Sequence, residues 1–156
     1  MPKVYQKEKI IVSACLLGEN CRYNAETKYD GELIRWLEDK EVIAFCPEDP
    51  VFGTPRAPIS VVNENGVMRL KRCSDGADVT TFIVDETKRF MALHKDVKNA
   101  ILKSKSPSCG CQTTPIYCSE NMDIGLGDGI SASLMKKNSY TIRDEKNYKT
   151  IFKDKK

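Results

Sequence analysis

The sequence predicts an α/β fold: a single domain spanning residues 1–156, with a mostly parallel Rossmann-like sheet flanked by helices and an inserted β-hairpin. Three observations support this. Apolar, β-branched runs at 10–14, 42–45 and 100–102 have the composition of buried strands. Segments with helical periodicity separate these runs, and an Asn-Gly turn between two further apolar runs is typical of a hairpin.

The first 46 residues have the pattern of a β-α-β unit. Between the first two apolar runs, Asp30 is placed to cap a helix. Leu33, Ile34 and Leu37 then recur at the spacing of one helix face. Because the crossover between two such strands is right-handed in nearly all proteins, we expect two neighbouring parallel strands.

The hairpin is predicted from Ile59–Val62 and Val67–Leu70, which flank Asn63-Glu64-Asn65-Gly66. Asn-Gly readily adopts positive φ, as a tight hairpin turn requires. In the α/β pattern this hairpin is expected as an insertion.

The second half of the chain returns to the α/β pattern. The longest helical candidate runs from Thr80 to Asn99 and leads into the run at 100–102. The glycine-rich segment 125–129 is interpreted as a turn that enters a helix at Ser131–Lys137. Tyr140–Arg143 is predicted to form the last strand.

Cysteine usage indicates the compartment. The chain has seven cysteines, an odd number, and its first residues do not resemble a signal peptide. We therefore expect a cytoplasmic protein, since free thiols persist in the reducing cytosol and are available for metal or redox chemistry. No apolar run approaches the roughly 18 residues of a membrane helix.

Charge does not indicate a nucleic-acid partner. The 25 basic and 22 acidic residues are spread along the chain and leave a formal net charge of +3. Nucleic-acid-binding domains usually show a strongly basic stripe or face instead. The sequence carries no signal for an oligomeric state.

Cys15, Cys46 and Cys109 each fall just beyond an apolar run. The carboxyl ends of parallel strands lie along one edge of a sheet, so these thiols are expected to converge there. Three convergent thiolates suit an iron-sulfur cluster or a zinc ion, and they leave one coordination position open. The alternative is that each is an inert core residue, because cysteine packs as a small hydrophobe and the spacing matches no compact ferredoxin or zinc-finger pattern. Cys111 or Cys118 would close the site if either supplied a fourth ligand.

Glu48 follows Cys46 by two residues, across Pro47. If Cys46 binds a metal, the Glu48 carboxylate lies within one turn of it and is suitably placed for a general base. The alternative is that Glu48, Asp49 and Pro50 form a solvated acidic turn.

Two serines, an arginine and a tyrosine complete the set of candidate site residues. Ser106 and Ser108 bracket Pro107, so their hydroxyls are expected in a fixed loop where they could hydrogen-bond a ligand. Arg22 and Tyr23 follow the first strand, at the same predicted edge, where Arg22 could contact an anionic or planar ligand. A surface salt bridge is the other interpretation of Arg22.

Several short motifs occur in the order seen in one bacterial family. They are Ser13-Ala14-Cys15-Leu16-Leu17-Gly18, Cys21-Arg22-Tyr23, Cys46-Pro47-Glu48, Thr54-Pro55-Arg56, Ser106-Pro107-Ser108-Cys109-Gly110 and Gly127-Asp128-Gly129. In this order the sequence resembles the thiouracil desulfurases, and the resemblance covers nearly the whole chain.

The resemblance implies a 4Fe-4S cluster held by Cys15, Cys46 and Cys109, with the fourth iron free to take sulfur from a thiolated nucleobase. It also implies Glu48 as the acid/base and Ser106 as an assisting hydroxyl. With this substrate class, Arg22, Tyr23 and Ser108 become candidate substrate-binding residues.

The implied partner is a small-molecule thiolated nucleobase such as thiouracil, with a thiolated RNA left open and no membrane partner. The implied activity is an iron-sulfur-dependent desulfuration without net redox change. The rival hypothesis is a non-catalytic metalloprotein: an iron-sulfur electron carrier or sensor, or a zinc-stabilised binding domain.

Overall fold

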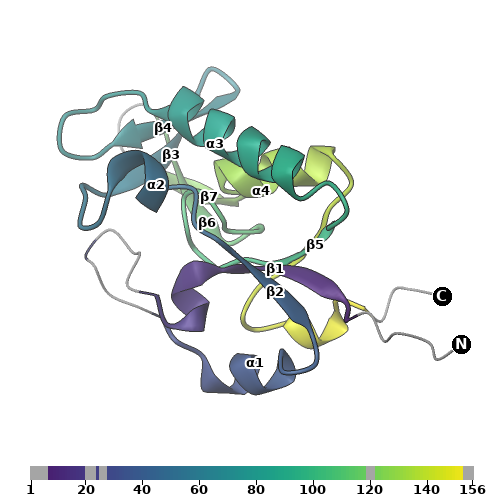
Figure 1. The fold of residues 1–156 in the computed structure, drawn as a ribbon. Coiled ribbons are helices and arrows are strands. Elements are labelled where there is room, and N and C mark those ends of the chain that lie inside the picture. The colour runs from purple at the N-terminus through teal and green to yellow at the C-terminus, as the bar shows by residue number, and fades with distance from the viewer. Residues whose placement is uncertain (1–6, 20–23, 25–27, 119–121, 153–156) are drawn as a thin grey trace, which may run out of the picture.

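Two four-stranded sheets organise the described part of the chain in the computed structural model (Figure 1). The structure describes residues 7–19, 24, 28–118 and 122–152. Sheet A has the strand order β2-β1-β5-β8, and sheet B has the order β4-β3-β6-β7.

Sheet A is parallel throughout. Its strands are β1 (Lys9–Ser13), β2 (Glu41–Phe45), β5 (Asn99–Ile101) and β8 (Thr141–Arg143). The structure thus confirms that the three apolar runs form strands, and it confirms the predicted last strand. From β1 the chain first adds β2 on one side and later β5 on the other, so the strand order reverses between β1 and β5.

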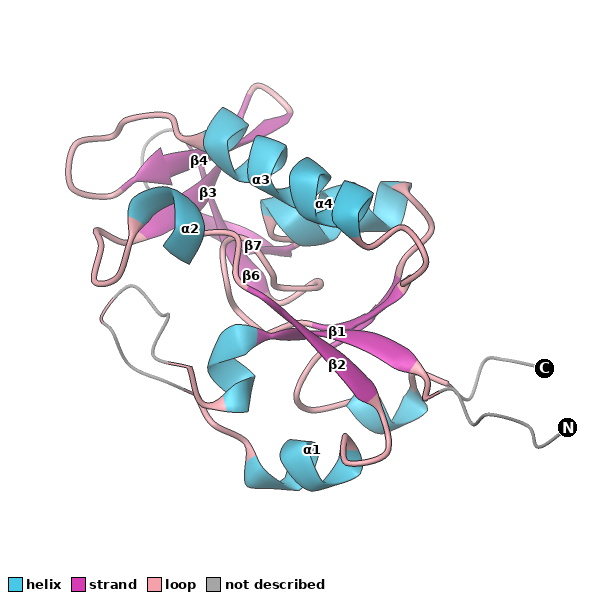
Figure 2. Ribbon diagram, viewed as in Figure 1, coloured by secondary structure: helices cyan, strands magenta, loops and turns pink. Residues whose placement is uncertain are grey.

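Helices cover both faces of sheet A. Helix α1 (Gly31–Trp36) packs Leu33 against Ile10 and Val12 of β1. Its predicted cap is confirmed, because Asp30 Oδ1 accepts a hydrogen bond from the Leu33 N–H at 3.1 Å. Two further helices lie over the opposite face (Figure 2). Ile11 of β1 packs there in a cluster with their side chains. Burial on both faces explains why β1 has a continuous apolar run.

The two further helices are α3 (Thr80–Leu93) and α4 (Ile130–Lys137). Helix α3 is shorter than the segment predicted from Thr80 to Asn99. The chain leaves the helix at His94 and places Val97, 1% exposed, in the core as part of the connection to β5. Val97 has the spacing of the apolar helix face but lies in a buried turn after the helix, which explains why the predicted helix was too long.

Sheet B begins with the predicted hairpin. Strands β3 (Ile59–Glu64) and β4 (Val67–Arg72) pair antiparallel, and Asn65 and Gly66 at the turn have φ of 54° and 87°. The description of this hairpin as an insertion was incomplete, because β3 also pairs in parallel with β6 (Thr114–Cys118). The hairpin is half of a second sheet.

Strand β7 (Asp123–Gly127) corrects a second expectation. Segment 125–129 was predicted as a turn, but residues 123–127 pair antiparallel with β6 across an irregular register. The strand is exposed and contains two glycines, and Gly125 has a φ of 126°. Its sequence therefore lacks the buried alternation by which strands are recognised, and pairing with β6 imposes the strand conformation.

Helices α3 and α4 pack against both sheets. Ile83 of α3 and Ile130 of α4 pack with Val61 and Leu70 of sheet B. Other residues of the same helices, Phe90 among them, pack against sheet A. Within the described ranges, no helix is long and apolar enough to cross a membrane.

Candidate functional site

A cavity of about 440 Å³ opens at the carboxyl edge of sheet A. Its walls include residues at or beyond the end of each strand of the sheet: 13–15 at the end of β1, 45–48 at the end of β2, 103–107 beyond β5, and 145–146 beyond β8. Open parallel sheets bind ligands outside the strand ends where the strand order reverses, and this cavity has that position.

Cys15, Cys46 and Cys109 all line this cavity, as the convergence of strand ends predicts. Cys15 lies in the short 3₁₀ helix η1 (Ala14–Leu17), which ends at Gly18. Gly18 has a φ of 100°, in the left-handed region that favours glycine. Cys46 directly follows β2 and is half-buried, whereas Cys15 and Cys109 are buried.

The loop that carries Cys109 is held by its own polar groups. Ser106 Oγ accepts hydrogen bonds from the backbone N–H of Ser108 at 3.2 Å and of Cys109 at 3.0 Å. The loop also approaches the start of α4 so closely that a Cβ on Gly129 would lie 2.5 Å from the Ser108 carbonyl carbon. Glycine at 129 is therefore required for this contact.

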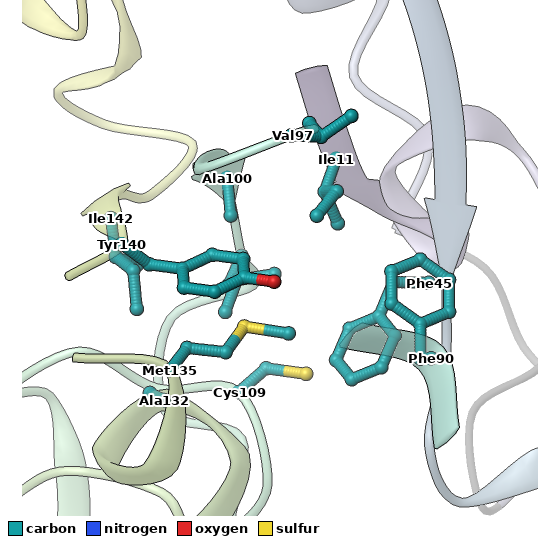
Figure 3. Close-up of a cluster of buried hydrophobic side chains, with 11 residues drawn as sticks. Ile11, Phe45, Phe90, Val97, Ala100, Cys109, Ala132, Met135, Tyr140 and Ile142 are labelled. Carbon is teal, nitrogen blue, oxygen red and sulfur yellow. The ribbon is translucent and has the colours of Figure 1, made fainter. Parts of the chain in front are cut away.

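Cys109 lies at the edge of the apolar core, beside Met135 and in one cluster with Phe45 and Phe90 (Figure 3). Burial raises the pKa of the Cys109 thiol, and the nearby Cys46 and Glu48 raise it further, while hydrogen bonds from the Ser13 and Ser106 hydroxyls act in the opposite direction. A cation would remove the mutual repulsion of these groups and replace the thiol proton. The donor set therefore fits a metal cluster.

The remaining described cysteines lie elsewhere. Cys111 lines a separate cavity with Gln112 and Lys136. Cys118 is opposite Asn63 in sheet B, and Cys73 is exposed directly after β4. None of the three lines the cavity of Cys15, Cys46 and Cys109, so the alternative in which Cys111 or Cys118 closes the site has no support in this arrangement.

The described residues also contain no group of three His, Cys, Asp or Glu side chains that could hold a metal ion. A tetrahedral zinc with bonds of about 2.3 Å would need sulfur atoms within about 4 Å of one another. Ligands on separate irons of a cluster are spaced more widely. Three thiols around one ion are thus not found among the described residues, and metal analysis of the protein decides between zinc and a cluster.

Glu48 lines the same cavity, at the N-terminus of α2 (Asp49–Phe52). Its side chain is only 12% exposed, so the alternative of a solvated turn residue does not hold. Arg56 Nε lies 3.3 Å from Glu48 Oε1, and Ser108 Oγ donates to Glu48 Oε2 at 2.9 Å. Arg56 had no predicted role, although the Thr54-Pro55-Arg56 motif was a signal for it.

The two predicted serines face different surroundings. Ser106 lines the cavity, as expected of a hydroxyl that contacts a ligand. Ser108 is completely buried, does not line the cavity and is hydrogen-bonded to Glu48, so its predicted contact with a substrate has no support here. Arg22 and Tyr23 lie outside the described residues.

A network around Lys103 forms another wall and was not predicted. Lys103 Nζ lies 2.9 Å from Glu145 Oε2, and the Ser104 backbone N–H donates to Glu145 Oε1 at 2.8 Å. Burial would raise the pKa of Glu145, but hydrogen bonds from Ser104 and Lys103 hold it below its usual value. The Lys103 backbone N–H also donates to Ser13 Oγ at 2.8 Å, which joins the ends of β1 and β5.

Comparison with known proteins identifies the class to which this fold and cavity belong. The model of the 2-thiouracil desulfurase family matches residues 10–147, so the chain belongs to the 2-thiouracil desulfurase family.

Two similar proteins cover most of the chain. The solved structure of TudS, a [4Fe-4S]-dependent thiouracil desulfidase, matches with a TM-score of 0.74 and 30% identity, over 93% of this chain and 95% of that one. YbbK of Bacillus subtilis (strain 168), an uncharacterized protein, is 30% identical over 145 residues, which are 87% of this chain and 95% of YbbK. The structural likeness to TudS, over 93% of this chain, confirms the predicted α/β class.

Proposed function

We propose that this chain removes sulfur from a thiolated nucleobase such as thiouracil, using a 4Fe-4S cluster bound by Cys15, Cys46 and Cys109. One observation carries the proposal: the three thiols line a single cavity together with the carboxylate of Glu48. Membership of the 2-thiouracil desulfurase family and the similarity to a [4Fe-4S]-dependent thiouracil desulfidase support it.

The cluster, when bound, would supply a Lewis-acidic iron with an exchangeable position that can stabilise the departing sulfur. Two features support three protein ligands. Cys15, Cys46 and Cys109 come from the ends of three neighbouring strands, and neither Cys111 nor Cys118 lines the cavity.

The reaction exchanges one heteroatom for another. The oxygen of water forms a bond to the thiocarbonyl carbon, the carbon–sulfur bond breaks, and sulfur leaves as sulfide. Carbon keeps its oxidation state, so no electron acceptor is required.

Glu48 takes a proton from the attacking water, and the Ser106 hydroxyl orients the substrate or relays a proton. Apolar walls at Phe45, Pro47 and Ile59 limit the access of other water molecules to this region. Arg22 and Tyr23 remain predicted substrate contacts.

The proposed partner is a free thiolated base, and the proposed location is the cytoplasm, where the thiols stay reduced. A thiolated RNA is the alternative substrate to include in the test.

The test is anaerobic purification followed by assay of sulfide release. We expect a brown protein with about four iron and four sulfide per chain, which liberates sulfide from thiouracil and leaves uracil. A panel of thiolated pyrimidines and a thiolated RNA identifies the substrate. Colourless protein containing zinc, or an iron-sulfur protein that releases no sulfide from any of these compounds, would favour the non-catalytic metalloprotein instead.

A further inference from the structure

Both oxygens of the Glu48 carboxylate are held by side chains from different loops. Arg56 contacts Oε1 at 3.3 Å, and the Ser108 hydroxyl contacts Oε2 at 2.9 Å. We propose that Arg56 and Ser108 are positioning residues that together fix the carboxylate of Glu48 against the cavity. This inference rests on the proposed function, in which Glu48 is the base. We call the pair the Glu48 clamp.

The Arg56 half of the clamp is rigid. Its side chain is 6% exposed, and Nη1 donates to the Gly53 carbonyl and to Thr54 Oγ1, each at 3.0 Å. Thr54 Oγ1 in turn is hydrogen-bonded to Asp49 in α2. The guanidinium therefore spans the loop after α2 and the carboxylate with separate nitrogens, a geometry that the single ammonium of lysine does not reproduce.

The Ser108 half is anchored by its backbone. The Ser108 carbonyl accepts hydrogen bonds from the N–H groups of Ser131 at 2.8 Å and Ala132 at 3.1 Å, at the start of α4. Its own N–H donates to Ser106 Oγ at 3.2 Å. Since the residue is also completely buried, its hydroxyl has little freedom and is directed at Glu48.

The clamp leaves acceptor capacity on Glu48 for the reaction. A carboxylate has about four lone-pair sites, and the clamp occupies one on each oxygen. The residue lines the cavity, so the remaining capacity is available to a water molecule there. A base held in one orientation needs no reorganisation when the substrate arrives, and a misplacement of about 1 Å can cost ~10²-fold in rate.

The contact itself is tested without cluster or substrate. Thermal unfolding of the apoprotein is measured for Arg56→Met, Glu48→Gln and the double variant. We expect Arg56→Met to lower the midpoint because it leaves a buried carboxylate without its cation, and we expect Glu48→Gln to restore much of the loss, because a neutral amide needs no cation. Strictly additive midpoint changes would overturn the clamp.

The catalytic role is tested with cluster-loaded protein of matched iron content. We expect kcat to fall by ~10²-fold in Arg56→Met and by about tenfold in Ser108→Ala, with KM changed by less than about twofold. Thr87→Val is the matched control for the loss of a buried hydroxyl, because Thr87 is also completely buried but its hydroxyl donates to the Ile83 carbonyl at 2.8 Å, away from the cavity. It should keep the parent kcat.

The same substitutions are then made in the Glu48→Gln background. A residue that acts only through Glu48 should cause no further loss of kcat there. An equal loss in both backgrounds, or a rise in KM with unchanged kcat, would overturn the positioning role. If Glu48→Gln itself keeps full turnover, then both the proposed base and the catalytic role of the clamp fail, whereas the apoprotein cycle still decides whether the contact exists.

Discussion

Sheet A and sheet B differ in where they direct polar side chains. Every neighbouring pair in sheet A is parallel, so the residues that follow all four strands gather at one edge, around one cavity. Sheet B is mixed, and residues that follow its strands emerge at both ends. Three described cysteines follow sheet A strands and line the cavity, whereas Cys118 ends β6 and Cys73 directly follows β4 in sheet B, and neither lines the cavity. Topology, more than cysteine content, decides which thiols converge.

Sheet B contributes to the site indirectly. Ile59, the first residue of β3, lines the cavity, and Arg56 precedes that strand. The rest of its inner face packs on α3 and α4. Chemistry at the edge of sheet A and stability in the core of sheet B should therefore respond to different substitutions.

The largest expected effect concerns the three cavity thiols. Cys46→Ala should lose the cluster, because a site with three protein ligands cannot readily give up one thiolate. Iron per chain after anaerobic reconstitution is the measurement, with Cys118→Ala as the control from sheet B. Cys15→Ala and Cys109→Ala should behave like Cys46→Ala. Full iron in Cys46→Ala, or lost iron in Cys118→Ala, would break the distinction between the two sheets.

The next largest effect is expected at Glu48, where a loss of turnover can be separated from a loss of the cluster. Glu48→Gln should keep its iron and lose ~10²–10⁴-fold in turnover, since the amide preserves the shape of the carboxylate but cannot take a proton at neutral pH. Sulfide release and iron content are measured on the same preparation. Turnover within about twofold of the parent would remove Glu48 from the reaction.

The two sheets also differ in how far the sequence could predict them. Strand β1 was recognisable because Ile10, Ile11 and Val12 are all buried, which leaves a continuous apolar run. Strand β7 was missed because Ile124 and Leu126 are exposed and glycines alternate with them. Its pairing partner, and not its own composition, makes it a strand.

The candidate site likewise has some features that the sequence predicted and others that only the structure reveals. The convergence of Cys15, Cys46 and Cys109 followed from strand ends alone. Which of the two serines beside Pro107 faces the cavity depends on loop geometry, which sequence patterns do not report. The pairing of Lys103 with Glu145 joins residues 42 positions apart and needed the structure as well.

A smaller effect, on stability only, is expected in the core of sheet B. Leu70 is completely buried against α3 and α4, so Leu70→Ala should reduce the free energy of unfolding by ~2–5 kcal/mol. Leu126→Ala, at a site 68% exposed on β7, should change it by less than ~0.5 kcal/mol. Urea unfolding measures both. Iron content and kcat of folded Leu70→Ala should equal those of the parent, and a selective loss of kcat would show that sheet B positions the site more directly.

The smallest effect depends on pH. Asp78 joins β4 to the start of α3: Arg69 Nε donates to its Oδ2 at 2.7 Å, and the Thr80 backbone N–H donates to its Oδ1 at 3.0 Å. The hydrogen bond from Arg69 holds the pKa of Asp78 well below its usual value of 3.8, although partial burial acts against this. A carboxyl whose pKa is lowered by folding stabilises the fold above its unfolded pKa, and that contribution disappears as the pH falls towards the folded value.

Because the pair is about one third exposed, Asp78→Asn should cost only ~1 kcal/mol at pH 7. Urea unfolding of parent and variant apoproteins at pH 7 and again near pH 3 measures the difference, which should shrink at the lower pH as the parent carboxyl loses its charge in the unfolded state. If parent and variant differ in unfolding free energy by the same amount at both pH values, the Asp78 side chain acts through packing and neutral hydrogen bonds. Its charge would then not stabilise the junction between sheet B and α3.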